Sequence, residues 1–196
     1  MTIARGLAAG VTLVALCAAP VWAQSQQPTV GVEAGFNFSR ISPPSTGQSV
    51  GMSPGFLAGV YTVIPFLKML SIQAELVYVQ KNTELTSTGR TSDLKLDYIE
   101  IPILAKLPLV KGIYILEGAA FDFPVRARLR PSSGAEQDIK SQVTSPDVGM
   151  VIGGGFPIQK FGIEGRYEGG FRKISTVSGA DVQRTRSFSG LVRVHF

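Results

Sequence analysis

The feature that most constrains the fold of this chain is an alternation of apolar and polar residues with a period of two. The clearest example covers residues 30–39, where valine, alanine and phenylalanine alternate with glycine, glutamate, asparagine and serine. Since successive side chains of a strand point to opposite faces, this period indicates strands with one apolar face. Comparable runs cover residues 70–79, 161–172 and 188–196, and less regular ones cover 55–64, 94–107, 113–123 and 148–156. The alternation therefore predicts eight strands.

The connections between these runs alternate in length. Residues 65–69, 108–112 and 157–160 make short connections, whereas residues 40–54, 82–93, 124–146 and 174–185 make long ones. Tight turns at one end and long loops at the other are typical of outer-membrane barrels. With 22 glycines, 12 prolines and 17% charged residues, the chain favours neither long helices nor disorder. We therefore expect an all-β, eight-stranded, antiparallel, up-and-down transmembrane barrel.

Residues 1–23 have the order of a secretory signal peptide. Arg5 supplies a positive charge, residues 6–20 are apolar except for Thr12, and a small residue, Ala23, precedes an abruptly polar stretch. The apolar part is shorter than the roughly 20 residues that a membrane-spanning helix needs. We expect cleavage after Ala23, which leaves residues 24–196 as the barrel domain. The one cysteine, Cys17, would be removed with the signal.

Alternation alone leaves open which face of the sheet is wet, since a soluble lipocalin-like barrel places its apolar face inside. Here the other face carries charges of both signs, which suit a narrow polar interior: Glu33, Glu75, Glu164, Arg166, Glu168, Arg172 and Arg193. Aromatic residues lie near the expected strand ends, as in the girdles of membrane barrels. The last strand places Phe188, Val192, Val194 and Phe196 in one apolar phase, and this ending resembles a signal read by the barrel-assembly machinery. These features favour a membrane barrel.

The charged residues of the polar face are expected to fill the barrel with ion pairs. An eight-stranded barrel has an interior just wide enough for side chains. The expected network consists of Glu75, Lys81, Glu100, Lys106, Glu164, Arg166 and Glu168. An ion or proton path along these residues is the alternative interpretation, and a closed plug of paired charges is favoured over it.

Two positions interrupt the alternation. A bulge near Tyr98 is expected, because Leu94 and Leu96 share its phase while Ile99 and Ile101 face lipid, and the bulge would let both runs present apolar groups to lipid or to an interface. Glu117 lies in the phase of apolar residues, and a bulge at Gly118 would turn it inward.

Basic residues gather in the segments expected at the outer rim: Arg126, Arg128, Arg130, Arg172, Lys173, Arg184 and Arg186. Guanidinium groups bind phosphate through paired hydrogen bonds, so contact with the phosphates of lipopolysaccharide is one interpretation. A solvated loop surface is the other. The net charge of +5 is too small an excess to indicate nucleic-acid binding, and the compartment is wrong for it.

No pattern of catalytic, metal or cofactor residues stands out. The only histidine, His195, lies beside the C-terminus. Glu164 and Glu168 have Arg166 between them on the same face, which indicates charge pairing rather than acid–base catalysis. Residues 153–155 are three glycines without the Gly-Lys-Ser/Thr of a phosphate-binding loop. We expect no enzyme activity, no cofactor and no metal.

Two adjacent runs carry a resemblance to a known family. Residues 72–81 read IQAELVYVQK and residues 98–106 read YIEIPILAK. They resemble the Gln-x-Glu-Leu-x-Tyr and Tyr-Leu-Glu-Ile-Pro-Leu-Leu-x-Lys strands of the outer-membrane β-barrel domain family often labelled PorT-like or "porin family", with Ile99 in place of leucine. Residues 147–155 and 164–167 resemble its later strands. The resemblance implies an eight-stranded barrel in a Gram-negative outer membrane and implies no reaction.

These observations together predict a monomeric outer-membrane barrel with a structural or surface-interaction role. Its expected partners are outer-membrane lipid, with lipopolysaccharide as one candidate, and the barrel-assembly machinery and periplasmic chaperones during biogenesis. A narrow transport pore is the first alternative. A soluble periplasmic binding barrel and a lipid-modifying barrel enzyme are the others.

Overall fold

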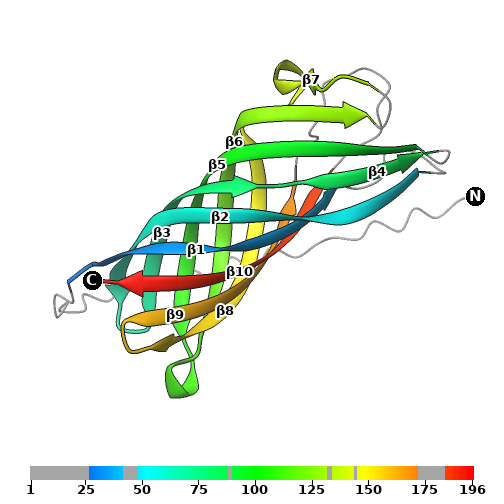
Figure 1. Cartoon of the computed structure of the whole chain (residues 1–196). Helices are drawn as coiled ribbons and strands as arrows, with labels where there is room; N and C mark the ends of the chain where they lie inside the picture. Colours follow the sequence, from blue (N-terminus) through cyan, green and yellow to red (C-terminus); the bar gives the residue numbers. More distant parts are fainter. Residues whose placement is uncertain (1–26, 42–47, 88–89, 132–133, 144, 172–183) are drawn as a thin grey trace, which may run out of the picture.

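The computed structural model describes residues 27–41, 48–87, 90–131, 134–143, 145–171 and 184–196. Nearly all of them lie in one antiparallel sheet (Figure 1). Its strands are β1 (Thr29–Ile41), β2 (Gln48–Leu67), β3 (Leu70–Gln80), β4 (Thr83–Ser87), β5 (Arg90–Pro108), β6 (Tyr114–Pro131), β7 (Gln137–Asp138), β8 (Asp147–Ile158), β9 (Phe161–Gly170) and β10 (Thr185–His195). Two short 3-10 turns, η1 (Val110–Gly112) and η2 (Lys140–Gln142), lie in the connections. No helix within these ranges is long and apolar enough to cross a membrane.

The sheet closes on itself. The first strand, β1, pairs with β2 on one side and with the last strand, β10, on the other. Both β3 and β4 pair with β2 and with β5, so together they fill one position of the ring. The two residues of β7 only extend the free edge of β6. The ring therefore has eight positions, and the predicted eight-stranded antiparallel up-and-down barrel is confirmed.

The ring has a short-turn end and a long-loop end, as the connection lengths predict. The β2–β3 and β8–β9 hairpins turn within two residues at the short-turn end, and both chain ends of the barrel lie there, since Val30 pairs through its carbonyl oxygen with the amide of Phe196. At the long-loop end the strands extend further than expected. Residues 48–54, 83–87, 90–93 and 124–131, expected to be loop, form the start of β2, β4, the start of β5 and the end of β6. The outward face of these extensions carries polar residues, such as Glu84, Asp93 and Arg128, because it lies beyond the apolar zone.

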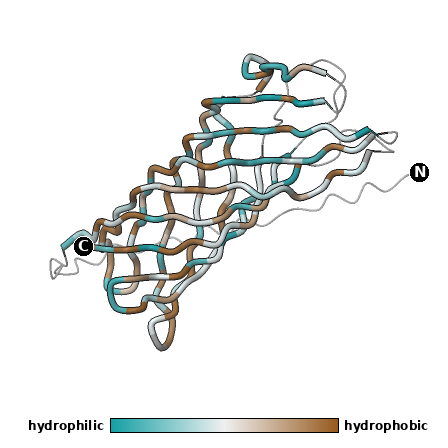
Figure 2. Tube along the Cα trace, in the orientation of Figure 1, coloured by the Kyte–Doolittle hydropathy of each residue, from teal (hydrophilic) through white to brown (hydrophobic). Residues whose placement is uncertain are grey.

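The outward face of the ring is apolar. Phe36 is 68% exposed, Ile152 54% and Val192 53%. Figure 2 shows hydrophobic and hydrophilic residues alternating along the strands. Large apolar side chains exposed around a whole ring fit lipid rather than water. The sheet must then be closed, because lipid offers no partners to strand edges. The apolar face of the sheet therefore lies on the outside of the barrel, as in a membrane protein, and the polar face lies inside.

The sheet irregularity near Tyr98 is present, but its effect differs from the expected one. The register shifts between Asp97 and Tyr98, and the extra residue is Val125 of the partner strand β6. Leu94, Leu96 and Tyr98 are therefore all buried inside the barrel, and the expectation that Leu94 and Leu96 face lipid or an interface is wrong. The phase changes in β6 instead, so that inward positions are even-numbered before the bulge and odd-numbered after it.

The expected bulge at Gly118 is absent from the pairing of β6 with both neighbours. Glu117 lies opposite Ala105 and Ile152 in unbroken register, and its side chain is exposed on the outward face. The prediction that Glu117 turns inward is wrong, since Tyr114 and Leu116 take the inward positions of this segment.

Candidate functional site

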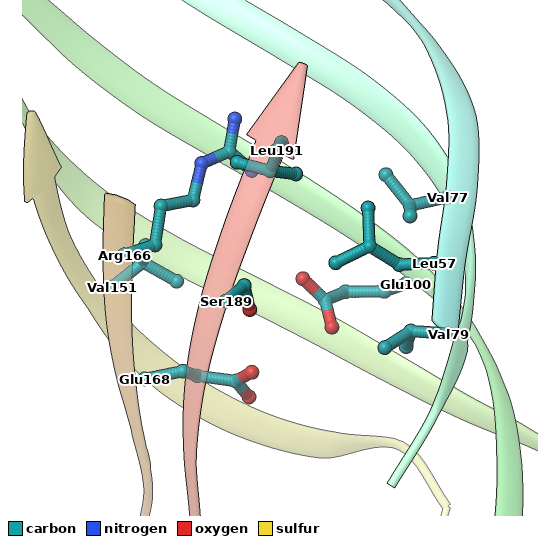
Figure 3. Close-up of a pocket in the computed structure, with 9 residues that line it drawn as sticks. All are labelled: Leu57, Val77, Val79, Glu100, Val151, Arg166, Glu168, Ser189 and Leu191. Carbon is teal, nitrogen blue, oxygen red and sulfur yellow. The ribbon is translucent and has the colours of Figure 1, made fainter. Parts of the chain in front are cut away.

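Two arginines organise the half of the interior nearer the short-turn end. Arg166 of β9 donates two hydrogen bonds of 2.6 Å to the carboxylate of Glu75 on β3, across the barrel. It also donates to Glu164 at 2.6 Å. Such paired contacts are the strong geometry for a guanidinium and a carboxylate. Figure 3 shows Arg166 reaching from β9 into the interior.

Arg193 of β10 extends this network. Its guanidinium contacts Glu164 and lies 3.0 Å from Glu33 Oε2. Arg193 donates a hydrogen bond of 2.7 Å to Gln73. Its guanidinium carbon lies 3.5 Å from the ring centre of Tyr61. We call the group formed by Glu33, Glu75, Glu164, Arg166 and Arg193 the arginine cluster. Its five side chains come from β1, β3, β9 and β10, and each is at most 7% exposed.

One lysine organises the next layer toward the long-loop end. Lys81 follows β3 and its side chain is 1% exposed. Its Nζ lies 2.6 Å from Asp122, 2.7 Å from Glu168 and 3.1 Å from Glu100. The carboxylates come from β6, β9 and β5, so one ammonium joins three strands from around the ring. We call these four residues the lysine cluster.

The two clusters are separated by a small cavity of about 20 Å³ (Figure 3). Glu100, Glu168 and Arg166 line it on the polar side, and Leu57, Val77 and Leu191 on the apolar side. A cavity of this size has room for about one water molecule. It is too small to join the clusters into a channel for a hydrated ion.

Apolar side chains fill the barrel at the long-loop end. Leu94, Leu96, Ala127 and Ile41 are at most 7% exposed and belong to one packed cluster. The connection after β7 covers this cluster with Ile139 and Val143, and the amide of Ile139 donates to the carbonyl oxygen of Ala127 at 3.0 Å. The interior is therefore polar at depth and closed by apolar packing above.

Lys106 does not join the ion network. Its Nζ lies 3.7 Å above the ring centre of Tyr114, and no carboxylate of the described residues lies within ion-pair distance of it. With His195 and Tyr61 it lines a cavity of about 200 Å³ that opens at the short-turn end. Tyr114 connects the two regions, since its hydroxyl donates to Glu164 at 2.7 Å. The inclusion of Lys106 in the charge network is therefore wrong, although the side chain does face inward.

The structure brings together the other six predicted network residues and adds three. Glu75, Glu164 and Arg166 meet in the arginine cluster, and Lys81, Glu100 and Glu168 in the lysine cluster. Glu33 and Arg193 were visible in the polar phase of their strands. The sequence analysis did not predict Asp122, although this residue has the inward phase of Tyr114 and Leu116.

The lysine cluster is also where metal-ligating groups gather. Glu100, Asp122 and Glu168 each offer a carboxylate oxygen within 4.8 Å of the others. The ammonium of Lys81 already contacts all three. A metal ion at the same point would meet that positive charge, so the geometry favours lysine as the cation of this cluster.

The basic residues of the expected rim fall into two groups. Arg126, Arg128 and Arg130 point outward from the end of β6, where Arg126 lies 3.7 Å from Asp97 and Arg128 lies 2.5 Å from Glu136. Arg184 and Arg186 are exposed at the start of β10. Arg172 and Lys173 lie outside the described residues.

The residues proposed as an assembly signal share the outward face of β10. Phe188, Val192 and Phe196 are 51%, 53% and 79% exposed. Val194 has the same phase.

These features together define the class of outer-membrane β-barrel proteins. They are a closed antiparallel ring, an apolar outer surface, a charged interior filled by side chains, and short turns at the end where both termini lie. A family model described as "Outer membrane protein beta-barrel domain" matches residues 22–176, and the chain belongs to this family. It is a protein of the bacterial outer membrane. Its short-turn end then faces the periplasm and its long-loop end the exterior.

Solved structures of outer-membrane barrels have the same fold. Neisserial surface protein A is 18% identical, with a TM-score of 0.57, and the match covers 87% of this chain and 100% of that one. Ail, the attachment invasion locus protein of Yersinia pestis, is 14% identical, with a TM-score of 0.51 and the same coverage. At these identities the likeness concerns the fold alone. Among curated proteins, no sequence matches this chain.

Proposed function

We propose that this protein is a closed, monomeric, non-catalytic barrel whose role is structural or interactive, and that it contacts phosphorylated lipid of the outer leaflet through its basic outer rim. The observation that carries the proposal is the filled interior: two charge clusters lie in series beneath an apolar closure. An interior of this kind supports a protein that acts through its surface.

The packing of the charges supports the closed state. Buried charges are expensive unless they are paired, and here the arginines and Lys81 each contact at least two carboxylates. A hydrated ion would have to displace these partners as well as the apolar residues around Leu96. The same arrangement argues against the transport pore, which is the first alternative.

The purified protein in planar lipid membranes is expected to pass no steady ionic current above that of the bare bilayer. The reason is that the arginine cluster, the lysine cluster and the apolar residues around Leu96 fill the described part of the interior in series. An open 16-stranded porin in the same membranes is the positive control. Reproducible current steps from folded protein would overturn the closed-barrel proposal.

The outer rim supports contact with an anionic partner. The rim arginines that the structure describes are exposed at the end of the barrel that lies beyond the apolar zone: Arg126, Arg128, Arg130, Arg184 and Arg186. The structure of Ail was determined in complex with the heparin analogue sucrose octasulfate, a polyanion. For this chain we propose a lipid phosphate as the anion, because the arginines lie next to the lipid-facing surface.

The lipid contact is tested by comparing two forms of one lipid. Folded protein in detergent micelles is expected to bind bisphosphorylated lipid A more tightly than lipid A stripped of both phosphates, with bound lipid counted by native mass spectrometry. The preference should weaken with added salt, since exposed charges are screened. Equal binding of both forms at low salt would overturn the lipid contact.

Biogenesis completes the proposal. Residues 1–23 would be a cleaved export signal, and the outward apolar face of β10, ending at Phe196, would be recognised by the assembly machinery, with chaperone help in the periplasm. The export segment lies outside the described residues.

A lipid-modifying enzyme finds less support. His195 lines the cavity at the periplasmic end, and the described residues around that cavity include no serine, cysteine or carboxylate that a histidine-based mechanism would use. Full retention of any hydrolase activity by a His195→Ala variant would remove the one histidine-based mechanism.

A further inference from the structure

The strongest unassigned feature of the outer surface is a pair of arginines that lie directly opposite each other. Arg40 near the end of β1 pairs in register with Arg186 near the start of β10, and both side chains are exposed on the outward face. Residues opposite each other on antiparallel strands have Cα atoms about 4.5–5.5 Å apart. Like charges at such positions destabilise a sheet, so this pair gains from an anion placed between them.

Neither arginine of this pair has an ion-pair partner among the described residues. The β6 arginines differ in this respect. Arg126 has Asp97 beside it, Arg128 has Glu136, and Arg130 lies opposite Asp93 in the register. Arg184 and Arg130 also lack an ion pair among the described residues, but Arg40 and Arg186 are the unpaired rim arginines that lie directly opposite each other.

Aromatic rings lie directly below the pair on the membrane side. Phe38 pairs with Phe188 two residues further into the barrel on the same faces, and they are 47% and 51% exposed. Tyr167 of β9 lies opposite Phe188, with ring centres 4.9 Å apart. Two residues of a strand span about 7 Å, so the arginines stand just above an aromatic layer of the kind found at the lipid–water boundary.

On the neighbouring strand an aromatic ring covers the position opposite Arg186. The residue there is Gly169, and the Tyr167 ring and hydroxyl lie 3.7 Å from where a Cβ atom of Gly169 would stand. A lipid bound at Arg186 would therefore meet Tyr167 on this side, with its acyl chains running down past Phe188 and Tyr167.

We infer that Arg40 and Arg186 form a clamp for one phosphate of an outer-leaflet lipid, with Phe38, Phe188 and Tyr167 as the apolar shelf for its chains. Two guanidinium forks at this spacing can both donate to one phosphate. The inference rests on the proposed lipid contact and names the residues that would make it.

The test compares two double variants with the same charge change. For Arg40→Gln with Arg186→Gln, the affinity for bisphosphorylated lipid A in detergent micelles is expected to fall about tenfold, which is about 1.4 kcal/mol. The matched control, Lys68→Gln with Lys160→Gln, is expected to change the affinity less than about twofold, because both lysines are exposed in the turns at the short-turn end, far from the outer rim. Each variant is first shown to be folded by the shift of its gel mobility on boiling. Native mass spectrometry counts the bound lipid.

The outcomes separate the clamp from the proposed function. Loss of affinity confined to the Arg40 and Arg186 variant supports the clamp. An equal or larger loss in the control variant, or an unchanged affinity in both, overturns the clamp while a preference of the unmodified protein for phosphorylated lipid A stands. If the unmodified protein shows no such preference, both proposals fail. A variant with both Arg40→Lys and Arg186→Lys should have an affinity for lipid A between those of the unmodified protein and the glutamine double variant. Lysine keeps the positive charge but lacks the paired donors of the guanidinium.

Discussion

Replacing Lys81 with methionine is expected to destabilise the folded barrel by about 3–5 kcal/mol. Methionine matches the length of the lysine stem but leaves Glu100, Asp122 and Glu168 facing one another without a cation. Removing one partner of a buried ion pair is far more costly than replacing the whole group, because the remaining charges stay buried. The measurement is urea-dependent unfolding from phospholipid vesicles.

A matched lysine on the neighbouring strand is the control. Lys95 of β5 is exposed, and no ion pair with it is found among the described residues, so Lys95→Met should change the free energy of unfolding by no more than about 0.5 kcal/mol. Neutralising a carboxylate as well, in Lys81→Met with Asp122→Asn, should recover part of the loss. A loss below about 1 kcal/mol for Lys81→Met would contradict the structural importance of the lysine cluster.

Replacing Gly35 with alanine is expected to destabilise the barrel by about 3 kcal/mol, the upper part of the usual range for overpacking. Gly35 lies in the inward phase of β1, between Leu57 of β2 and Leu191 of β10. A Cβ atom added to it would lie 2.0 Å from the carbonyl oxygen of Gly190 and 2.8 Å from the Cα of Leu191. Since backbone atoms cannot move aside as the end of a side chain can, the strands themselves would have to shift.

The control substitution is at Gly190. This glycine lies on the adjacent strand β10, in the outward phase of Phe188 and Val192. A Cβ atom added there meets nothing within 4 Å. Gly190→Ala should therefore change the free energy of unfolding by at most about 0.5 kcal/mol. Unfolding from vesicles and the gel shift on boiling both report the difference. Similar effects of the two substitutions would show that the close approach at Gly35 does not limit packing.

The rim shows where pairing across strands changes an interpretation made along one strand. Arg126, Arg128 and Arg130 stand out in the sequence because they alternate with apolar residues. Arg40 does not stand out, since it is a single basic residue at the end of a run. The ring places it opposite Arg186, which lies 146 positions later and pairs with it in register. The pair therefore became visible only when the last strand closed onto the first.

The sequence by itself determined the period of the strands, their number, the alternating lengths of the turns and which face of most strands is polar. These properties are local, because the alternation of side chains belongs to each strand alone. For the same reason Glu75, Glu164 and Arg166 were placed correctly in the interior.

Only the tertiary structure decided which charges meet, where the phase changes and where the strands end. Lys81 and Asp122 are 41 residues apart, and the bulge at Val125 reverses the phase of β6 so that Arg126 points outward. Glu117 kept the phase that the alternation alone assigns to it. Register is a property of two paired strands, and a slip of one residue exchanges the two faces of a strand. The partners of a buried charge are therefore defined only by the registers of the closed ring.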